Sequence, residues 1–104
     1  MTSKYLARDT RTDQITAAAL TLAERSPGGY RSLSREAIAQ AAEVSPALVS
    51  ARMGTMESVR RLIIRAAIKA GNARVVAQGL AVGDPHARKA PDALRQKAAK
   101  LITG

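Results

Sequence analysis

Residues 34–55 have the sequence SREAIAQAAEVSPALVSARMGT. Two signals for the start of a helix stand close together in this stretch, at Ser34 and Ser45, because a serine hydroxyl can cap the free backbone N–H groups of a first helical turn. After Ser34, Ile38 and the alanines around it recur at helical spacing. This pattern predicts a first helix over residues 35–43.

A second, short helix is predicted over residues 46–53. Ser45 can cap it, and Pro46 occupies the first helical position, where the fixed backbone angle of proline is favourable. Val49 and Met53 lie four residues apart and therefore share one side of this helix. We expect that side to face the core.

The turn between these two helices is too short to let them lie antiparallel, which is typical of a helix-turn-helix motif. Ala39 is small where the helices must approach each other, and Val44 can pack under the turn. In this motif the second helix enters the major groove of DNA. The outer side of the second helix would then face the bases, and it is small and uncharged: Pro46, Ala47, Ser50, Ala51 and Gly54.

Upstream of this motif the sequence predicts a basic arm followed by a helix. Residues 1–11 carry three basic side chains without a sustained apolar period, which is typical of an arm. Residues 12–25 have the apolar stripe of a helix, and Ser26-Pro27-Gly28-Gly29 ends it. Tyr30 is expected to pack in the core or against the turn.

Downstream, Thr55 can cap a long fourth helix that continues to about residue 80, although Gly71 and Gly79 weaken its far end. Residues 83–91, rich in Gly and Pro, are predicted to be a linker with an exposed His86, and a last helix covers residues 92–103. The predicted fold is all-α: a helix-turn-helix domain of three helices, a long fourth helix and a short C-terminal helix. The predicted division is 1–11 (arm), 12–57 (DNA-binding domain) and 58–104 (dimerisation).

The net charge of +9 on 104 residues indicates a polyanionic partner. Residues 1–57 hold 7 basic and 6 acidic side chains, whereas residues 58–104 hold 10 and 2. Two tyrosines and no other aromatic residue make stacking on unpaired bases unfavourable, so double-stranded DNA is the expected partner.

Several classes of protein and site are not expected from this composition. Cysteine is absent and His86 is the one histidine, which argues against a metal site or thiol chemistry. No nucleophile stands beside a base and no carboxylate pair suggests acid–base work, so no enzyme and no cofactor are predicted. Without an apolar run of membrane length or a signal-like N-terminus, we expect a cytoplasmic, nucleoid-associated protein with no membrane partner.

The run GYRSLSREAIAQAAEVSPALVSARMGTMESV, residues 29–59, resembles the DNA-binding domain of the tetracycline-repressor (TetR) family. Residues 15–24, ITAAALTLAE, are similar to the first helix of that family, so the resemblance covers roughly residues 12–65. The run is similar to the order of features in that family: a Gly-aromatic pair, a Ser or Thr cap, Ile-Ala, a Gly-Val-Ser turn, an aromatic-rich recognition helix and a capped fourth helix.

Three positions depart from the family pattern. Glu43 replaces the usual Gly of the turn, Ser50 replaces a phosphate-contacting Tyr, and Met56 replaces a phosphate-contacting Lys. The retained cap, Ser34, has Arg35 beside it as an additional charge. The large ligand-binding domain of the family cannot fit in the residues after 80, so no small-molecule effector is expected; short proteins of this kind are typical of phage or plasmid regulators.

The predicted DNA contacts fall into three groups. Base contacts are assigned to Ser45, Pro46, Ala47, Ser50, Ala51 and Arg52; phosphate contacts to Ser34, Arg35 and Thr55; and minor-groove contacts of the arm to Lys4, Arg8 and Arg11. Further basic residues on the fourth helix either flank the DNA or form a solvated helix face: Arg61, Arg65 and Lys69.

The apolar stripe of the fourth helix extends beyond what a three-helix core needs, which suggests a homodimer. The predicted seam consists of Val76, Leu80, Leu94, Leu101 and Ile102, with a loosely ordered basic tail as the alternative for residues 92–104. The resulting hypothesis is a repressor that binds an inverted repeat as a homodimer. Two alternatives are a non-specific architectural DNA-binding protein and the DNA-recruiting small subunit of a phage packaging machine.

Overall fold

A computed structural model describes residues 3–103 of the chain, with side chains from residue 10 to residue 102. This part is all-helical and contains no β-strand, which confirms the predicted fold class. It has six α-helices where five were predicted: α1 (Ser3–Arg25), α2 (Arg35–Ala42), α3 (Pro46–Met53), α4 (Met56–Ala70), α5 (Ala73–Ala81) and α6 (Asp92–Thr103). Two 3-10 turns complete it, η1 (Tyr30–Ser32) and η2 (Ala87–Lys89).

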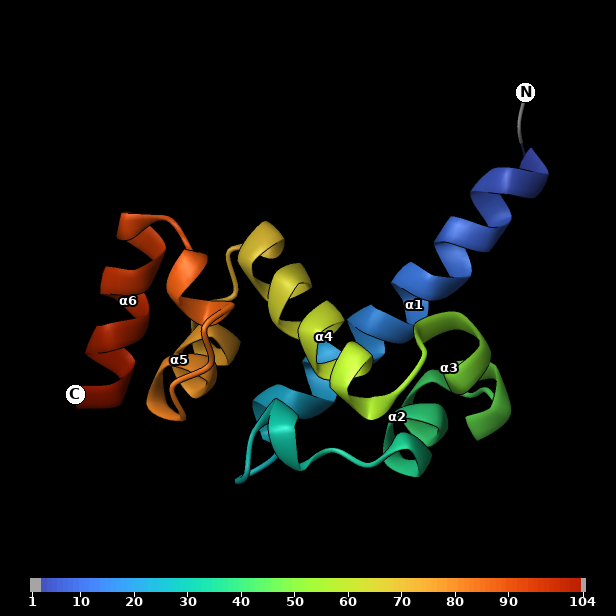
Figure 1. Cartoon of the computed structure of the whole chain (residues 1–104), viewed down its shortest axis with the longest axis horizontal. Helices are drawn as coiled ribbons and strands as arrows, with labels where there is room; N and C mark the ends of the chain where they lie inside the picture. The colour runs from blue at the N-terminus through green and yellow to red at the C-terminus, as the bar shows by residue number, and fades with distance from the viewer. Residues whose placement is uncertain (1–2, 104) are drawn as a thin grey trace.

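The molecule is elongated, with principal extents of 42 × 31 × 20 Å. Figure 1 shows α2 and α3 together at one end and α5 and α6 at the other. Helices α1 and α4 pack against each other between these two ends. We refer below to the α2–α3 end and the α5–α6 end, with α1 and α4 as the middle that joins them.

Helix α1 corrects the predicted basic arm. It begins at Ser3, nine residues before the predicted start, so residues 3–11 are helical backbone whose first turns extend beyond the other helices in Figure 1. Once residues 12–25 are fixed by packing, adding turns at an end costs little, and Leu, Ala, Lys and Arg favour the helix even without an apolar stripe.

None of the helices in residues 3–103 combines enough length with enough apolar character to cross a membrane.

The predicted long fourth helix is two helices. Helix α4 ends at Gly71, which adopts the left-handed conformation (φ 70°), and the side chain of Asn72 then caps α5 by accepting a hydrogen bond from the Val75 N–H at 3.1 Å. Gly and Asn at these positions are a combined stop and start signal. Interpreting Gly71 as a weak point in one helix was wrong, because the chain changes direction there.

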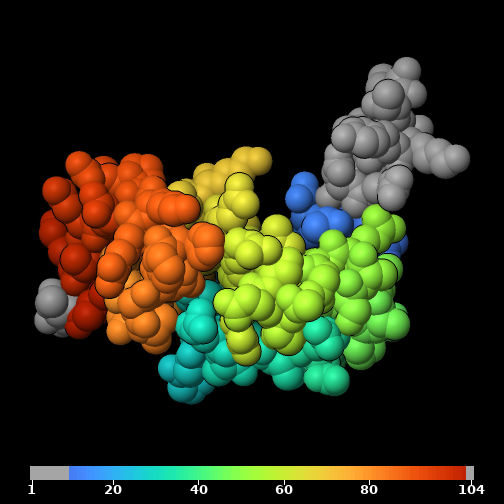
Figure 2. Space-filling model, in the orientation of Figure 1, coloured from blue at the N-terminus to red at the C-terminus, as the bar shows by residue number. Residues whose placement is uncertain are grey.

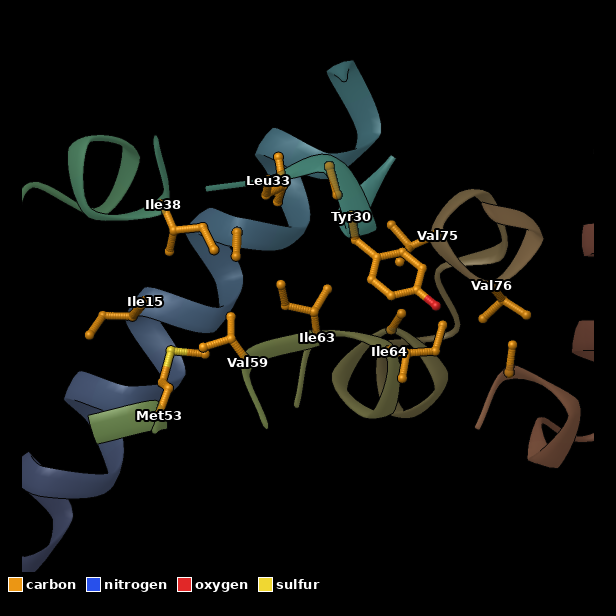
Figure 3. Packing of buried hydrophobic residues seen from close by; sticks show 14 of the residues in the cluster. Ile15, Tyr30, Leu33, Ile38, Met53, Val59, Ile63, Ile64, Val75 and Val76 are labelled. Carbon is orange, nitrogen blue, oxygen red and sulfur yellow. The ribbon is translucent and has the colours of Figure 1, made fainter. Parts of the chain in front are cut away.

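A single apolar core extends through both ends of the molecule. Figure 3 shows Ile15, Ile38, Met53 and Val59 grouped where α1 to α4 meet, and Tyr30 beside Val75. Ile63 of α4 lies between the two groups, and all the residues of this cluster are buried. The α5–α6 end is therefore continuous with the rest of the core.

Helices α5 and α6 pack on each other, and this removes part of the predicted dimer seam. Val76 is fully buried and Leu94 is 8 % exposed, so the chain itself already covers both, while Leu80 is half-buried. Part of the surplus apolar stripe is therefore covered by α6 of the same chain. Of the predicted seam, Leu101 and Ile102 remain exposed.

The predicted linker over residues 83–91 is folded. It contains η2, and its residues Asp84, Ala87 and Ala90 are buried. His86 is half-buried and not fully exposed as predicted. The Gly and Pro of this segment form a tight connection between α5 and α6, because Gly83 takes a positive φ and Ala87 packs directly against Gly79.

Candidate nucleic-acid interface

Local hydrogen bonds fix the turn between α2 and α3. Ser34 caps α2 by accepting from the Ala37 N–H at 3.0 Å, and Ser45 caps α3 by accepting from the Leu48 N–H at 3.1 Å, as predicted. At the end of α2, the Val44 N–H donates to the carbonyl of Ala39 at 2.9 Å. Such closing bonds satisfy carbonyls that the helix end leaves free.

Glu43 carries the backbone strain of this turn. Its φ of 60° and ψ of 43° are left-handed, and it is the one non-glycine with a positive φ in the described residues. Helix α2 therefore ends at Ala42, one residue earlier than predicted. The turn keeps the geometry that glycine favours, so the substitution noted in the sequence is tolerated at a cost of about 1–2 kcal/mol.

The inner side of α3 is anchored in the core. Val49 is fully buried and Met53 is 2 % exposed, while Ala39 of α2 is 1 % exposed where the two helices meet. The burial of Val49 and Met53 confirms the predicted inner side, and Ala39 lies at the close approach that the sequence predicted. Because the anchors are buried and both helices are capped, the outer side of α3 has a defined orientation.

The outer side of α3 lies at the surface, where Figure 2 shows this segment at one end of the molecule. All the predicted base-contact residues are exposed and lie on this one helix or at its cap: Ser45, Pro46, Ala47, Ser50, Ala51 and Arg52. The largest is Arg52, near the end of the helix. A surface of small side chains allows a backbone to approach closely, and its hydroxyls can donate or accept hydrogen bonds.

The predicted phosphate contacts lie at the start of α2 and at the start of α4, and the predicted arm contacts lie on α1. Ser34 and Thr55 are exposed caps whose oxygens accept from backbone N–H groups, the latter from Ser58 at 3.2 Å, so their hydroxyl protons are available to an acceptor. Arg35 is half-buried, and its Nε has no hydrogen-bond partner. Arg11 is exposed on α1, whereas the side chains of Lys4 and Arg8 lie outside the described residues.

Most of the positive charge lies away from α3, on α4 and beyond. Arg61, Arg65 and Lys69 are exposed along α4. Three ion pairs join described side chains: Arg31 with Asp84, Arg60 with Glu57, and Arg95 with Asp92. The exposed arginines and lysine of α4 are therefore free to attract an external anion.

A buried polar group joins η1 to the connection between α5 and α6, and sequence reasoning missed it. The hydroxyl of the fully buried Tyr30 donates to Oδ2 of Asp84, whose Oδ1 accepts the His86 N–H at 2.9 Å. Burial, followed by the bond to this carboxylate, raises the pKa of Tyr30 well above its ordinary value. The phenol is therefore a permanent donor at neutral pH.

A glutamine bridges the same junction. The Gln78 side chain accepts from the Tyr30 N–H at 2.9 Å and donates to the carbonyl of Ala23 at 2.9 Å. These partners lie 48 and 55 residues apart in sequence. No local pattern signals such pairs, and Asp84 in a Gly-Asp-Pro run has the features of an ordinary turn residue.

In the described part of the chain, no group of three or more His, Cys, Asp or Glu residues is arranged to hold a metal ion. Comparison with protein-family models, with curated proteins and with solved structures gives no match.

Proposed function

We propose that α2, the turn over residues 43–45 and α3 form a helix-turn-helix that places α3 in the major groove of double-stranded DNA. The single observation that supports this most strongly is the outer face of α3: it is exposed, built of small residues, and held by Val49 and Met53 in the core. Short capped helices in this order are the usual means of presenting a recognition helix to DNA.

Base readout would be modest and affinity would come largely from phosphates. Ser45 and Ser50 can hydrogen-bond to several base edges, and the methyl groups of Ala47 and Ala51 can touch thymine methyl groups. Arg52 is the candidate for a guanine contact. With a net charge of +9, binding would weaken steeply as salt rises, because each phosphate contact releases counterions.

We infer a transcriptional repressor of the TetR type in a short form, acting by occlusion of a promoter. A homodimer would present two copies of α3 to successive major grooves about 34 Å apart on an inverted repeat. Leu101 and Ile102, 53 % and 48 % exposed at the end of α6, are the residues of the original seam that remain available to a second copy. Neither an enzymatic activity nor a cofactor is part of this proposal.

The dimer is tested by the double variant Leu101→Asp, Ile102→Asp. Two carboxylates in an apolar interface would prevent association, so light scattering should give half the mass of the wild type, with weaker operator binding. An unchanged mass would exclude this seam. A mass several-fold above a dimer in the wild type would instead favour the ring of a packaging subunit.

A second candidate function is non-specific coating of DNA. The excess of positive charge in residues 58–104, outside α3, favours it. Footprinting on genomic fragments selected by binding separates the two functions. A protected palindrome supports a regulator, whereas uniform protection along the fragment supports an architectural protein.

The variant Arg52→Ala tests the assignment of the base contact. It should reduce affinity for the preferred site by about 1–3 kcal/mol and leave affinity for unrelated DNA nearly unchanged. An equal loss on all sequences would move Arg52 to the phosphate contacts.

A further inference from the structure

A basic groove runs between α4 and the 82–89 segment, and no residue of α3 lines it. It consists of two pockets of about 230 Å³ and 350 Å³ that share His86 in their walls. Figure 2 shows this segment and α4 lying side by side. We refer to the two pockets together as the α4 groove.

Five basic side chains from three elements converge on the α4 groove. Arg31 comes from η1, Arg60, Arg61 and Arg65 from α4, and Lys89 from η2. Residues so far apart in sequence meet here because Tyr30 and Asp84 fasten η1 to the connection between α5 and α6. The clustering of charge is thus a product of the fold and not of one helix face.

The two acidic residues in the walls do not neutralise this charge. Asp84 is 6 % exposed, and its oxygens accept from the Tyr30 hydroxyl and the His86 N–H, while Arg31 lies 3.8 Å away. Glu57 lies 3.8 Å from Arg60, but its side chain is 76 % exposed, so this pair is loose. Five positive and two negative groups leave a local excess of three positive charges.

The guanidinium groups also retain unused donors. The Nε of Arg60 is buried and has no hydrogen-bond partner. Among the described side chains, Arg61 and Arg65 form no ion pair. The planar guanidinium groups of Arg61 and Arg65, which have no carboxylate partner among the described side chains, match the oxygens of a phosphate group, which can accept several of these bonds at once.

We propose that the α4 groove is a phosphate-binding site. Its combined shape suits a group with two or more adjacent phosphate charges, because Arg60 and Arg61 line one pocket and Arg65 and Lys89 line the next. Two sources offer this chemistry: successive phosphates of a DNA backbone, or a phosphorylated small molecule. The DNA source rests on the proposed function, whereas the small-molecule source does not depend on it.

The test compares one groove variant with one matched control. Arg61→Gln together with Arg65→Gln removes two exposed charges from the groove, and Arg74→Gln together with Lys97→Gln removes two exposed charges from α5 and α6. All four positions are at the surface, so both proteins should fold as the wild type does. Circular dichroism checks this.

The first measurement uses inorganic pyrophosphate as the probe, with potassium chloride at equal ionic strength as the reference. If the groove takes a free phosphate compound, pyrophosphate should raise the Tm of the wild type and of the control, and its affinity should fall at least about tenfold in the groove variant. Equal affinity in all three proteins would mean general charge attraction and not a site.

The second measurement is the salt dependence of binding to duplex DNA. Loss of two phosphate contacts should reduce the slope of log K against log salt by about 1.8 in the groove variant and leave the control slope unchanged. That result identifies the DNA backbone as the source. A pyrophosphate effect confined to the groove, with unchanged DNA slopes, identifies a phosphorylated small molecule.

The proposal is overturned if the groove variant behaves as the control in both measurements. Its failure differs from a failure of the proposed function. If the wild-type protein binds no duplex DNA at all, the helix-turn-helix proposal falls, and the pyrophosphate measurement still decides whether the α4 groove is a phosphate site.

Discussion

The two ends of the molecule differ in how they are built and in what they offer to a partner. The α2–α3 end presents small, nearly uncharged side chains on a short helix fixed by local caps. The α5–α6 end is held by long-range contacts, and together with α4 it carries most of the net positive charge. Under the proposed function, α3 would supply the shape that fits the major groove, and the positive charge of α4 to α6 would supply attraction to phosphates.

A buried junction fastens the α5–α6 end to the turn after α1. Tyr30, Asp84 and Gln78 connect the turn after α1 to α5 and to the connection that follows it. If the junction loosens, η1 is no longer fastened to α5 and to the connection that follows it. Changes at the junction should therefore have the largest effect on stability.

The largest effect is expected for Tyr30→Phe. Removing the hydroxyl leaves the carboxylate of Asp84, 6 % exposed, without its main donor, which should lower the free energy of unfolding by about 2–3 kcal/mol. Urea denaturation measures this. Arg31→Gln, which removes the 3.8 Å ion pair to the same carboxylate from a half-exposed side chain, should cost less than about 1 kcal/mol. Equal losses would contradict the role of the hydroxyl.

A somewhat smaller effect is expected for Gly79→Ala. An added Cβ would lie 2.7 Å from the Cβ of Ala87 and 2.9 Å from the hydroxyl oxygen of Tyr30, so α5 must shift, at a cost of about 2 kcal/mol. The comparison variant is Gly71→Ala, where no atom lies within 4 Å and the penalty of about 1 kcal/mol arises from the positive φ alone. A neutral Gly79→Ala would show that the junction is loosely packed.

Alkaline pH should weaken the same junction. Below pH 10, the ordinary tyrosine pKa, Tyr30 is protonated in both the folded and the unfolded state. Above pH 10 the unfolded chain releases this proton. The folded chain retains it, because its Tyr30 pKa is raised. Stability should therefore fall as pH rises above 10, by up to about 1.4 kcal/mol per pH unit from this group. The difference between wild type and Tyr30→Phe across pH 9–11 isolates it. A constant difference would refute the raised pKa.

The smallest effect, and a stabilising one, is expected at the α3 end. Glu43→Gly removes a side chain from a left-handed position, at the expense of greater freedom in the unfolded chain, and should raise the free energy of unfolding by about 0.5–1 kcal/mol. Thermal unfolding would detect a Tm increase of a few degrees. Glu36→Gly, within the ordinary helix α2, should instead be destabilising by a similar amount.

The α2–α3 end could be predicted from the sequence almost to the residue, because its signals are local. Ser34 and Ser45 cap helices that start one residue later, and Val49 and Met53 face the core as their spacing predicts. The exposed outer face of α3 follows from the same periodicity. For this part, neighbours in sequence contain the information that determines the structure.

Helices α4 to α6 are predicted less well from the sequence, because their arrangement depends on contacts between residues far apart in the sequence. Val76 and Leu94 are buried because α6 folds back on α5. The local sequence of each helix predicts an apolar face but does not predict which element covers that face. The hydrogen bond from the Tyr30 hydroxyl to Asp84 joins residues 54 positions apart in the sequence. The break between α4 and α5 does have a local signal, because Gly71 is a typical helix stop and Asn72 a typical N-cap.

The central claim, that the outer face of α3 lies in the major groove, is tested most directly by the DNA affinity of Ser50→Glu against Gln96→Glu. Each variant adds one negative charge at an exposed position, the first on α3 and the second on α6, so their effects on net charge are the same. We predict that Ser50→Glu lowers affinity for duplex DNA at least about tenfold at fixed salt, while Gln96→Glu lowers it less than about threefold. Equal losses in the two variants would contradict the account, because α3 would then be no closer to DNA than α6.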